Sequence, residues 1–327
     1  MLLGIDGGGT QTRAVLAEPG GAVRGRGVSG ASNQATTGAA GARRALVLAW
    51  EAARAEAGAG PADVAGACFG LAGLDHPADE AAFRDATSSL GLPRPPTLCN
   101  DSVIAWAGAT AGGPGIAVIS GTGSVAYGRD ASGRGRRAGG WGGVLGDEGS
   151  AFRIAAAAVN RVLRGVDGRE PPSALGPTLA RAAGLEAPAD LCLLSRPDRA
   201  AAAGRPIEAV LAALAPAVTA AASAGDRDAA AIVAEAGRDV AALAAAIARG
   251  LGLQRPAVHG LGSVLLSGGP VAAAADAALR ELLGVGMLPP RHPALVGALI
   301  LAHEAAWGGP PPATTAAAWS AALATGP

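Results

Sequence analysis

Two glycine-rich turns, each enclosed by short apolar runs, constrain the fold of this chain more than any other feature. The first turn is Asp6-Gly7-Gly8-Gly9-Thr10-Gln11-Thr12, which lies between the apolar segments 2–5 and 13–17. The second is Ser120-Gly121-Thr122-Gly123-Ser124, which lies between 116–119 and 125–127. Short apolar runs on both sides of a turn are typical of paired strands. The sequence therefore predicts two strand–turn–strand units.

Both turns have the chemistry of a phosphate site. Glycine lets a backbone approach a phosphate closely and adopts a positive φ at little cost. Successive backbone N–H groups then form an anion-binding nest, to which hydroxyl groups add donors. Asp6 ends the first predicted strand, where its carboxylate could hold a hydrated Mg²⁺. The first turn alone fits an ordinary hairpin equally well, but a matched pair of such turns favours the binding of a polyphosphate.

The rest of the chain alternates between strand-like and helix-like segments. Strands are predicted near 2–6, 13–18, 22–28, 66–71, 97–100, 258–266 and 285–288, with the second hairpin at 116–129. Helices are predicted near 38–57, 78–90, 102–110, 271–284 and 293–306, with a nearly all-helical stretch from 150 to 252. This alternation predicts an α/β fold whose sheets are covered by helices.

The glycine-rich link 111–115 precedes the second hairpin and marks the predicted domain boundary. The predicted domains are 1–112, with the first hairpin, and 113–307, with the second hairpin and the helical stretch. Residues 308–327 are rich in Gly, Pro, Ala and Thr, and we expect them to form a flexible tail.

Composition excludes several classes of function. All 26 basic residues are arginine, so the phosphate-binding lysine of a P-loop and a lysine Schiff base are both excluded. The formal net charge is zero, which gives no support to a nucleic-acid partner. Outside charged alanine-rich helices, no apolar run approaches the ~18 residues of a membrane span, and we see no signal-peptide pattern.

Cysteines and histidines show no metal-site spacing. Cys68, Cys99 and Cys192 lie far apart and form no CxxC pair, which favours free thiols in a reducing, cytoplasmic compartment. The histidines are similarly dispersed, at His76, His259, His292 and His303. We therefore expect no resident transition metal.

Asp101 is the candidate catalytic base on position alone. It follows the apolar segment 97–99 and precedes a helix that is predicted to begin near Ser102. A carboxylate at the carboxyl end of a strand lies where ligands usually bind in α/β folds. An aspartate before a helix is also a common N-cap, and the sequence leaves both interpretations open.

Taken in order, these motifs resemble the N-acetylglucosamine kinases and the related BadF/BadG/BcrA/BcrD-type ATPases of the actin–Hsp70–sugar kinase superfamily. The matching segments are 6–12, 32–33, 72–75, 100–102, 120–124, 139–150 (GGWGGVLGDEGS) and 266–269. The resemblance implies an α/β protein with two ribonuclease-H-like (actin-like ATPase) domains around a central nucleotide and sugar cleft.

The resemblance also implies a role for each motif residue. Asp101 would accept the proton of the sugar hydroxyl, and Asp6 would bind Mg²⁺ through water. Contacts to ATP and its phosphates would come from Gly8, Gly9, Thr10, Thr12, Gly121, Thr122, Gly268 and Gly269. Contacts to the substrate would come from Asn33, Asp101, Ser124, Gly140, Trp141, Gly142 and Asp147.

Three of these residues also have an ordinary structural interpretation. Trp141 could be a core aromatic, Asn33 a turn residue, and Asp147 a cap for the helix that is predicted to follow it. The role of Glu148 is left open.

The implied reaction is the ATP- and Mg²⁺-dependent phosphorylation of a sugar hydroxyl, with N-acetylglucosamine converted to its 6-phosphate as the leading expectation. The mammalian-type enzymes often carry Asn at the position of Val125, so glucosamine, glucose and N-acetylmuramic acid remain alternatives. Two other functions also remain. One is an ATPase that activates a partner enzyme, for which the dispersed cysteines are poorly suited, and the other is a non-catalytic nucleotide-binding scaffold. The expected partner is a small sugar, with no nucleic acid and no membrane, and the chain could act as a homodimer.

Overall fold

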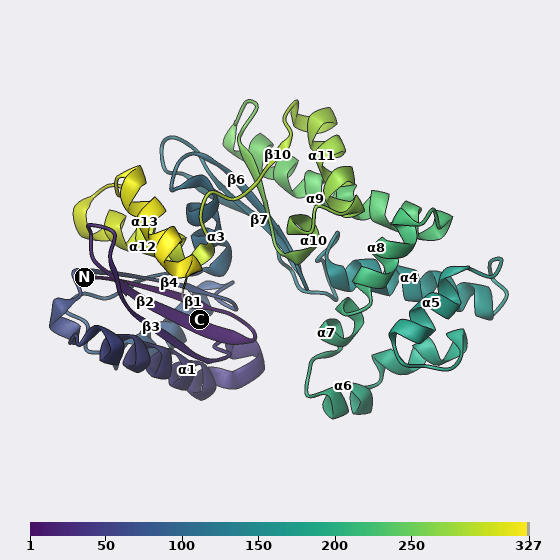
Figure 1. Cartoon of the computed structure of the whole chain (residues 1–327), viewed down its shortest axis with the longest axis horizontal. Helices are drawn as coiled ribbons and strands as arrows, with labels where there is room; N and C mark the ends of the chain where they lie inside the picture. The colour runs from purple at the N-terminus through teal and green to yellow at the C-terminus, as the bar shows by residue number, and fades with distance from the viewer. Residues whose placement is uncertain (326–327) are drawn as a thin grey trace. The chain divides into compact units, whose positions relative to one another are not determined.

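The computed structural model describes residues 1–325, apart from the side chain of Arg199. The chain forms two compact units, of which one combines Met1–Pro114 with the segment from Pro290 onward and the other is Gly115–Pro289 (Figure 1). The observed boundary lies close to the predicted one at residue 112. The sequence-based division differs at the other end, because residues 290–307 belong to the first unit and not to the second.

The first unit is built on a mixed sheet with the strand order β3-β2-β1-β4-β5. The strands β1 (Leu2–Gly7), β2 (Gln11–Ala17) and β3 (Val23–Gly30) form an antiparallel meander. The strands β4 (Gly66–Leu71) and β5 (Thr97–Asn100) continue the sheet parallel to β1. The tight turn between β1 and β2 and the buried parallel strand β4 thus lie where the sequence predicted them.

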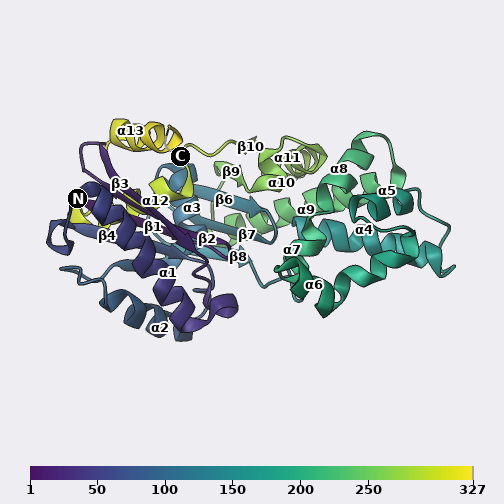
Figure 2. The same ribbon diagram turned by 60° about the horizontal axis from the view of Figure 1, so that its bottom comes forward.

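Helices cover both faces of this sheet. The helices α1 (Gln34–Ala57) and α2 (Pro77–Ser88) lie on one face, and α3 (Asp101–Thr110) and α12 (Ala294–Trp307) lie on the other (Figure 2). Side chains alternate along β1 accordingly. Leu3 and Ile5 join the core with α1, while Gly4 faces α12, since a Cβ atom at Gly4 would lie 3.2 Å from that of Ala298. A short 3₁₀ turn, Pro61–Asp63, precedes β4.

The C-terminal segment returns to the first unit by close helix packing. A Cβ atom at Gly297 of α12 would lie 1.9 Å from the carbonyl oxygen of Ile104, so only glycine lets α12 approach α3 this closely. The predicted flexible tail instead contains the helix α13 (Ala313–Ala324). Trp319 of α13 is fully buried, and its Nε1 donates to the carbonyl oxygen of Glu18 at 3.1 Å. Residues 326 and 327 of the predicted tail lie outside the described residues.

The second unit repeats the topology of the first, with the strand order β10-β9-β6-β7-β8. The strands β6 (Gly115–Ser120), β7 (Ser124–Arg129) and β8 (Gly135–Gly139) form the antiparallel meander. The strands β9 (Val258–Leu261) and β10 (Met287–Leu288) run parallel to β6. The sequence did not predict β8. It also extended β9 to residue 266, where the structure has the short helix α10 (Ser263–Leu266).

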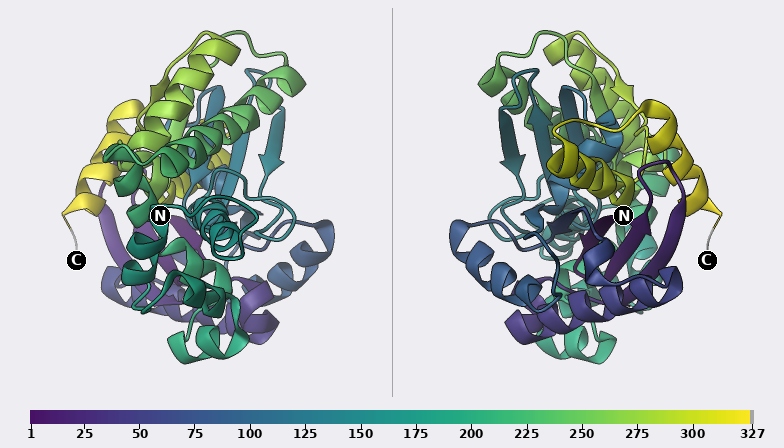
Figure 3. Two further views of the ribbon diagram at one scale, coloured as in Figure 1. Left: turned by 90° about the vertical axis from the view of Figure 1, so that its right-hand side faces the viewer. Right: turned by 90° about the vertical axis from the view of Figure 1, so that its left-hand side faces the viewer.

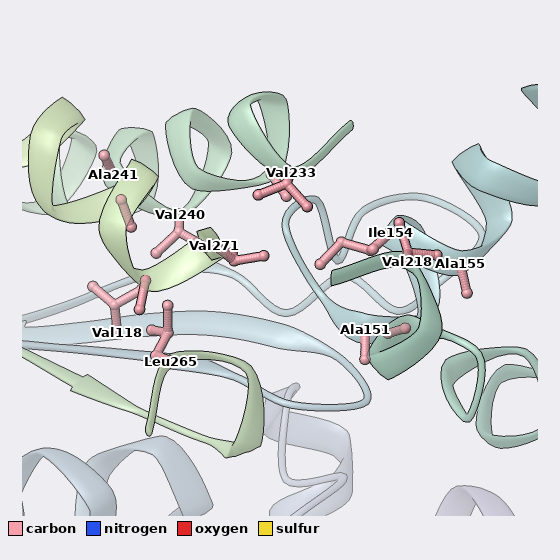
Figure 4. Packing of buried hydrophobic residues seen from close by; sticks show 14 of the residues in the cluster. Val118, Ala151, Ile154, Ala155, Val218, Val233, Val240, Ala241, Leu265 and Val271 are labelled. Carbon is pink, nitrogen blue, oxygen red and sulfur yellow. The ribbon is translucent and has the colours of Figure 1, made fainter. Parts of the chain in front are cut away.

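Helices make up most of the second unit. The long helix α9 (Arg227–Leu251) lies beside α11 (Pro270–Leu283) on the sheet (Figure 3). The other helices are α4 (Ala151–Val166), α5 (Leu175–Ala182), α6 (Pro197–Ala203), α7 (Ile207–Ala212) and α8 (Ala215–Ser223), with a 3₁₀ segment at Pro188–Ser195. Their core joins Val118 of β6 to Val240 of α9 and Ile154 of α4 (Figure 4).

Two cysteines that are distant in sequence are close in space. Cys68 and Cys99 occupy neighbouring strands, with their sulfur atoms 3.9 Å apart. Both are free thiols, and burial together with the contact to Cys99 raises the pKa of Cys68. The hydrogen bond with Cys99 is the larger cause of that rise.

Within the described residues, no single helix is long and apolar enough to span a membrane. The bent helix pair Ile207–Ser223 and Arg227–Leu251 reaches the length and apolar composition of a span only when its two helices are taken together.

Candidate functional site

The first phosphate turn is open at its tip and anchored at its base. The N–H of Gly8 donates to the carbonyl oxygen of Gln11 at 2.9 Å, which closes the turn. The carbonyl oxygens of Gly8 and Gly7 accept from the backbone of Ser32 and Ala72 at 3.1 and 2.7 Å. Gly9 and Thr10 are exposed. The backbone of the tip is therefore accessible to a ligand while neighbouring segments hold its base.

Asp6 and Arg13 face each other across the hairpin. They are directly paired between β1 and β2, so their side chains share one face of the sheet. Burial raises the pKa of Asp6, and the Arg13 guanidinium lowers it in part. Thr12 points to the opposite face, where it is buried and its hydroxyl donates to the carbonyl oxygen of Gly30 at 2.8 Å. We assign the Thr12 side chain to support of the hairpin, because its hydroxyl proton is used inside the sheet.

Asn33 and the segment after β4 lie against each other. The Oδ1 atom of Asn33 accepts from the N–H of Ala35 at 2.9 Å and so caps α1. A Cβ atom at Gly73 would lie 2.5 Å from the same oxygen. The packing of Asn33 on Gly73 brings together two of the segments that carried the family resemblance.

The N-cap of α3 is Asn100 and not Asp101. The Oδ1 atom of Asn100 accepts from the N–H of Ser102 at 3.0 Å, and its Nδ2 atom donates to Oδ1 of Asp75 at 2.9 Å. Asp101 occupies the first helical position and is half-buried. Backbone dipoles at a helix N-terminus interact favourably with a negative charge at this position. The structure thus removes capping as the reason for an aspartate at residue 101.

Asp6 and Asp101 belong to the same side of the first sheet. Strand pairing places Arg13, Asp6, Gly70 and Cys99 in one row across the sheet. A Cβ atom at Gly70 would lie 2.3 Å from the side chain of Ile104, so this row faces α3. The helix that begins with Asp101 therefore covers the face to which the Asp6 side chain belongs.

The second turn is fastened to the loop at 146–150 by several hydrogen bonds. The Ser120 hydroxyl donates to the carbonyl oxygen of Gly149 at 2.8 Å, and the Ser124 hydroxyl donates to that of Glu148 at 2.7 Å. The N–H of Ala151, the first residue of α4, donates to the carbonyl oxygen of Gly121 at 2.8 Å. Thr122 at the tip is exposed. The hydroxyl of Ser124 therefore binds the loop, and Thr122 is the accessible hydroxyl of this turn.

Asp147 links the loop to the turn in a conformation that few side chains adopt. Its φ is 59°, in the left-handed region. Its carboxylate accepts backbone hydrogen bonds from Ser124 and Gly142, and a Cβ atom at Gly123 would lie 2.7 Å from Oδ2. Burial is the main cause that raises the pKa of Asp147, and these backbone bonds oppose the rise. Ser150, and not Asp147, caps α4 through its Oγ atom. A strained residue held this firmly is a candidate ligand contact.

Trp141 is not a core aromatic. Its side chain is 73% exposed, and Val144 and Leu145 of the same loop are 85% and 81% exposed. Gly140 and Gly142, on either side of Trp141, both have positive φ.

A cavity of about 280 Å³ lies between α4 and α9 and opens beside Glu148, which lines it with Arg153 and Asp239. The loop at 140–149 therefore presents both apolar and acidic side chains.

Gly262 lies next to the second turn, which the sequence analysis missed. β9 ends at Leu261, and a Cβ atom at Gly262 would lie 2.2 Å from the carbonyl oxygen of Ser120. Gly268 and Gly269 come later, where Gly269 is the N-cap of α11. A glycine directly after an apolar strand could have indicated this position. The sequence analysis did not use it, because it predicted that the strand continues to residue 266.

No metal centre is built from side chains in the part of the chain that the structure describes. No group of three or more His, Cys, Asp and Glu side chains there is arranged to hold a metal ion. Asp6 alone suits a Mg²⁺ ion that shares its coordination shell with water and phosphate oxygens.

Curated relatives match parts of the chain. The N-acetylmuramic acid/N-acetylglucosamine kinase of Clostridium acetobutylicum is 44% identical over 102 residues, which cover 31% of this chain and 33% of that protein. The N-acetyl-D-glucosamine kinase of Dictyostelium discoideum is 29% identical over 184 residues, which cover 54% of this chain and 58% of that protein. The chain thus spans about a third and somewhat over half of the lengths of these relatives.

A solved structure and a family model match over most of the chain. The crystal structure of a candidate N-acetylglucosamine kinase from Chromobacterium violaceum matches with a TM-score of 0.70 and 30% identity, over 92% of this chain and 98% of that one. The model of the BadF/BadG/BcrA/BcrD ATPase family matches residues 3–302. On this match, which spans both hairpins and both sheets, the chain belongs to the BadF/BadG/BcrA/BcrD ATPase family.

Proposed function

We propose that this protein is an ATP-dependent sugar kinase that transfers a phosphoryl group to a hydroxyl of an amino sugar, with N-acetylglucosamine as the leading substrate and its 6-phosphate as the product. The observation that carries the proposal is the coupling of the second phosphate turn to the loop at 139–150. Ser120, Ser124 and Asp147 each bind that loop to the turn. These hydrogen bonds fix the proposed phosphate-binding turn and the loop with polar and aromatic side chains relative to each other. Transfer of a group between two bound molecules requires such fixed positions.

Each residue has a chemical task in this reaction. The open backbones of Gly8–Thr10 and Gly121–Thr122 bind phosphate oxygens through N–H groups and threonine hydroxyls. Asp6 holds Mg²⁺ through water, and Mg²⁺ supplies charge neutralisation of the polyphosphate. Asp101 accepts the proton of the attacking hydroxyl, because it lies in the first turn of α3 and is not its N-cap. Asn33, Trp141 and Asp147 orient the sugar.

The names of both curated relatives support an N-acetylated amino sugar as the substrate class. The Clostridium relative adds N-acetylmuramic acid as a second candidate. Val125 is half-buried on β7, and a Cβ atom at Gly140 would lie 3.0 Å from its Cγ2 atom. In this proposal, the sugar meets an apolar side chain at this position. Glucosamine and glucose remain weaker alternatives.

Activation of a partner enzyme is the competing function within this family. The close pair Cys68 and Cys99 does not favour it, because Cys68 is buried inside the sheet and its thiol contacts that of Cys99 on the neighbouring strand. A cluster shared with a partner requires accessible thiolates. The sugar kinase remains our proposal.

A coupled assay of ADP release tests the proposal. Purified protein is incubated with Mg²⁺, ATP and, separately, N-acetylglucosamine, N-acetylmuramic acid, glucosamine and glucose, and the products are analysed by mass spectrometry and ³¹P NMR. We expect sugar-stimulated ADP release with phosphorylation at the 6-hydroxyl of N-acetylglucosamine. If another sugar alone is phosphorylated, the substrate is wrong and the kinase stands. If no sugar stimulates release, the kinase proposal is wrong.

A further inference from the structure

Cys68 and Cys99 form a pair of thiols in the first sheet, close to the start of α3. Their sulfur atoms lie 3.9 Å apart, on the neighbouring parallel strands β4 and β5. Both residues are free thiols, so the sulfur atoms are in contact without a bond. Neither thiol has a task in the proposed phosphoryl transfer, and the pair therefore requires an explanation of its own.

The two thiols differ in their access to solvent. The side chain of Cys68 is fully buried, whereas Cys99 is half-buried on a strand whose four residues are all at least partly exposed. The hydrogen bond with Cys99, together with burial, raises the pKa of Cys68. Hydroperoxides oxidise the thiolate form of cysteine, and they do so where it is accessible. Cys99 is therefore the thiol that a small oxidant reaches first, and Cys68 remains a thiol beside it.

A bond between these cysteines requires one strand to shift. Cys68 is paired with Thr97 and Cys99 is paired with Gly70, so the cysteines lie diagonally across the two strands. Diagonal neighbours in a sheet have Cα atoms about 7–8 Å apart, whereas a disulfide usually spans about 4.4–6.8 Å. The strand β4 is buried throughout and lies between β1 and β5, whereas β5 is the outermost strand. We therefore expect β5 to be the strand that moves.

Movement of β5 acts directly on the start of α3. Asn100 follows Cys99, caps α3 by accepting from the N–H of Ser102 at 3.0 Å, and donates to Asp75 at 2.9 Å. Asp101 is the next residue and begins the helix. We propose that Cys99 is a site of reversible oxidation by hydroperoxides and that the disulfide it then forms with Cys68 displaces the start of α3. The modification site rests on the two thiols alone, and only its effect on turnover rests on the proposed function.

The oxidation takes place in two steps that consume one hydroperoxide. In the first step, the Cys99 thiolate attacks one oxygen of hydrogen peroxide, the O–O bond breaks, and the departing hydroxide takes up a proton to become water. Cys99 is then a sulfenic acid. In the second step, the sulfur of Cys68 attacks that of Cys99, the S–S bond forms, and the S–O bond breaks. The departing hydroxide takes the Cys68 proton, so two thiols and one peroxide give one disulfide and two waters.

A purely structural role is the alternative, in which both cysteines serve as small apolar side chains of the sheet. Peptide mapping separates the two roles. Trypsin cleaves after Arg84, whereas Arg94 precedes a proline and resists cleavage, so Cys68 and Cys99 lie in the separate peptides 55–84 and 85–129. A disulfide joins these two peptides in a digest that has not been reduced.

The experiment treats the protein with a few equivalents of hydrogen peroxide and follows it by mass spectrometry, by amide hydrogen exchange and by sugar phosphorylation. The variants are Cys68→Ala and Cys99→Ala. The matched control is Cys192→Ser, which removes the exposed cysteine of the 3₁₀ segment in the other unit. Dimedone traps any sulfenic acid, and dithiothreitol tests whether the oxidation is reversed.

We expect peptides 55–84 and 85–129 to become joined in wild type and in Cys192→Ser, and amide exchange in the first turn of α3 to increase. Turnover should fall roughly tenfold or more and recover with dithiothreitol, because misplacing a reacting group by about 1 Å can cost ~10²-fold. Cys68→Ala should accumulate the dimedone adduct at Cys99. Cys99→Ala should give no adduct at Cys68, and its turnover should resist peroxide.

Failure of the two peptides to join, or an equal loss of turnover in Cys99→Ala, overturns the inference. Joined peptides with unchanged amide exchange in α3 overturn the proposed displacement. If Cys68→Ala does not fold, Cys99→Ala provides the same test at a half-buried position. Untreated wild type that phosphorylates no sugar overturns the proposed function, while joining of the peptides would still support the oxidation site. Wild type that is active but forms no disulfide overturns this inference alone.

Discussion

The two hairpins occupy equivalent places in sheets of the same topology, yet they differ in charge. Asp6 and Arg13 form the penultimate pair of the β1–β2 ladder, and Ile119 and Val125 form the penultimate pair of the β6–β7 ladder. The first hairpin thus carries a charged pair where the second carries an apolar pair. The second hairpin is in turn fastened to a loop through Ser120 and Ser124. The same topology therefore carries a charged pair at the first hairpin and an apolar pair, with hydroxyl bonds to a loop, at the second.

The difference indicates a division of labour within the proposed kinase. In that proposal, Asp6 and Asp101 of the first unit act on charges and protons. The second unit contributes backbone N–H groups, the loop with Trp141 and Asp147, and the segment that begins at Gly262. Substitutions of Asp6 and Asp101 should accordingly affect chemistry, and substitutions of Trp141 and Asp147 should affect recognition.

The largest expected effect is in the first unit. Asp101→Asn should lower kcat by about 10²- to 10⁴-fold, which is the usual contribution of general-base assistance, while binding of an ATP analogue changes little. Steady-state kinetics and calorimetry measure the two quantities. Asp85→Asn, which alters an exposed carboxylate of α2, serves as the control. Activity within a few-fold of wild type would show that Asp101 is not the base.

The second prediction concerns how the C-terminal helix α13 is held within the first unit. Trp319→Ala removes a fully buried side chain through which α13 packs on the first unit, and it should lower the free energy of unfolding by about 3–5 kcal/mol. Urea denaturation followed by fluorescence measures it, with Trp307→Ala as the control because that side chain is 49% exposed. Equal stabilities of the two variants would contradict the packing of α13.

The third prediction concerns the fastening of the loop to the second turn. Asp147→Asn keeps a residue that tolerates a positive φ but removes the charge that accepts two backbone N–H groups. We expect kcat/KM for the sugar to fall roughly 10- to 100-fold, since hydrogen bonds to a charged group are involved. Affinity for the ATP analogue should fall less. Asp198→Asn on α6 is the control, and a greater loss of nucleotide than of sugar would reverse the assignment.

The smallest effect is expected where the second hairpin is apolar. Val125→Asn places an amide at the position equivalent to Arg13 and should change the ratio of kcat/KM between N-acetylglucosamine and glucose by about tenfold or less. Val125→Thr, which is nearly isosteric, distinguishes polarity from shape. Unchanged ratios in both variants would show that Val125 does not face the sugar.

Local features of the sequence determined the turns and most of the elements around them. Glycines between apolar runs have few alternatives to a tight turn, so both hairpins and the strands β1, β2, β6 and β7 could be predicted from adjacent residues alone. The absence of lysine and the motif at 139–150 similarly required no structure. The sequence could also name Asp101 as a candidate base, but it could not separate that role from capping.

Only the tertiary structure decided the features that depend on residues far apart in the chain. It assigned the cap of α3 to Asn100, returned α12 and α13 to the first unit, and brought Cys68 next to Cys99. It ended β9 at Leu261 and so brought Gly262 to the second turn, and it placed Arg13 opposite Asp6. The physical reason is that strand register and helix packing are set by contacts between distant segments, whereas turn chemistry is set by neighbouring residues.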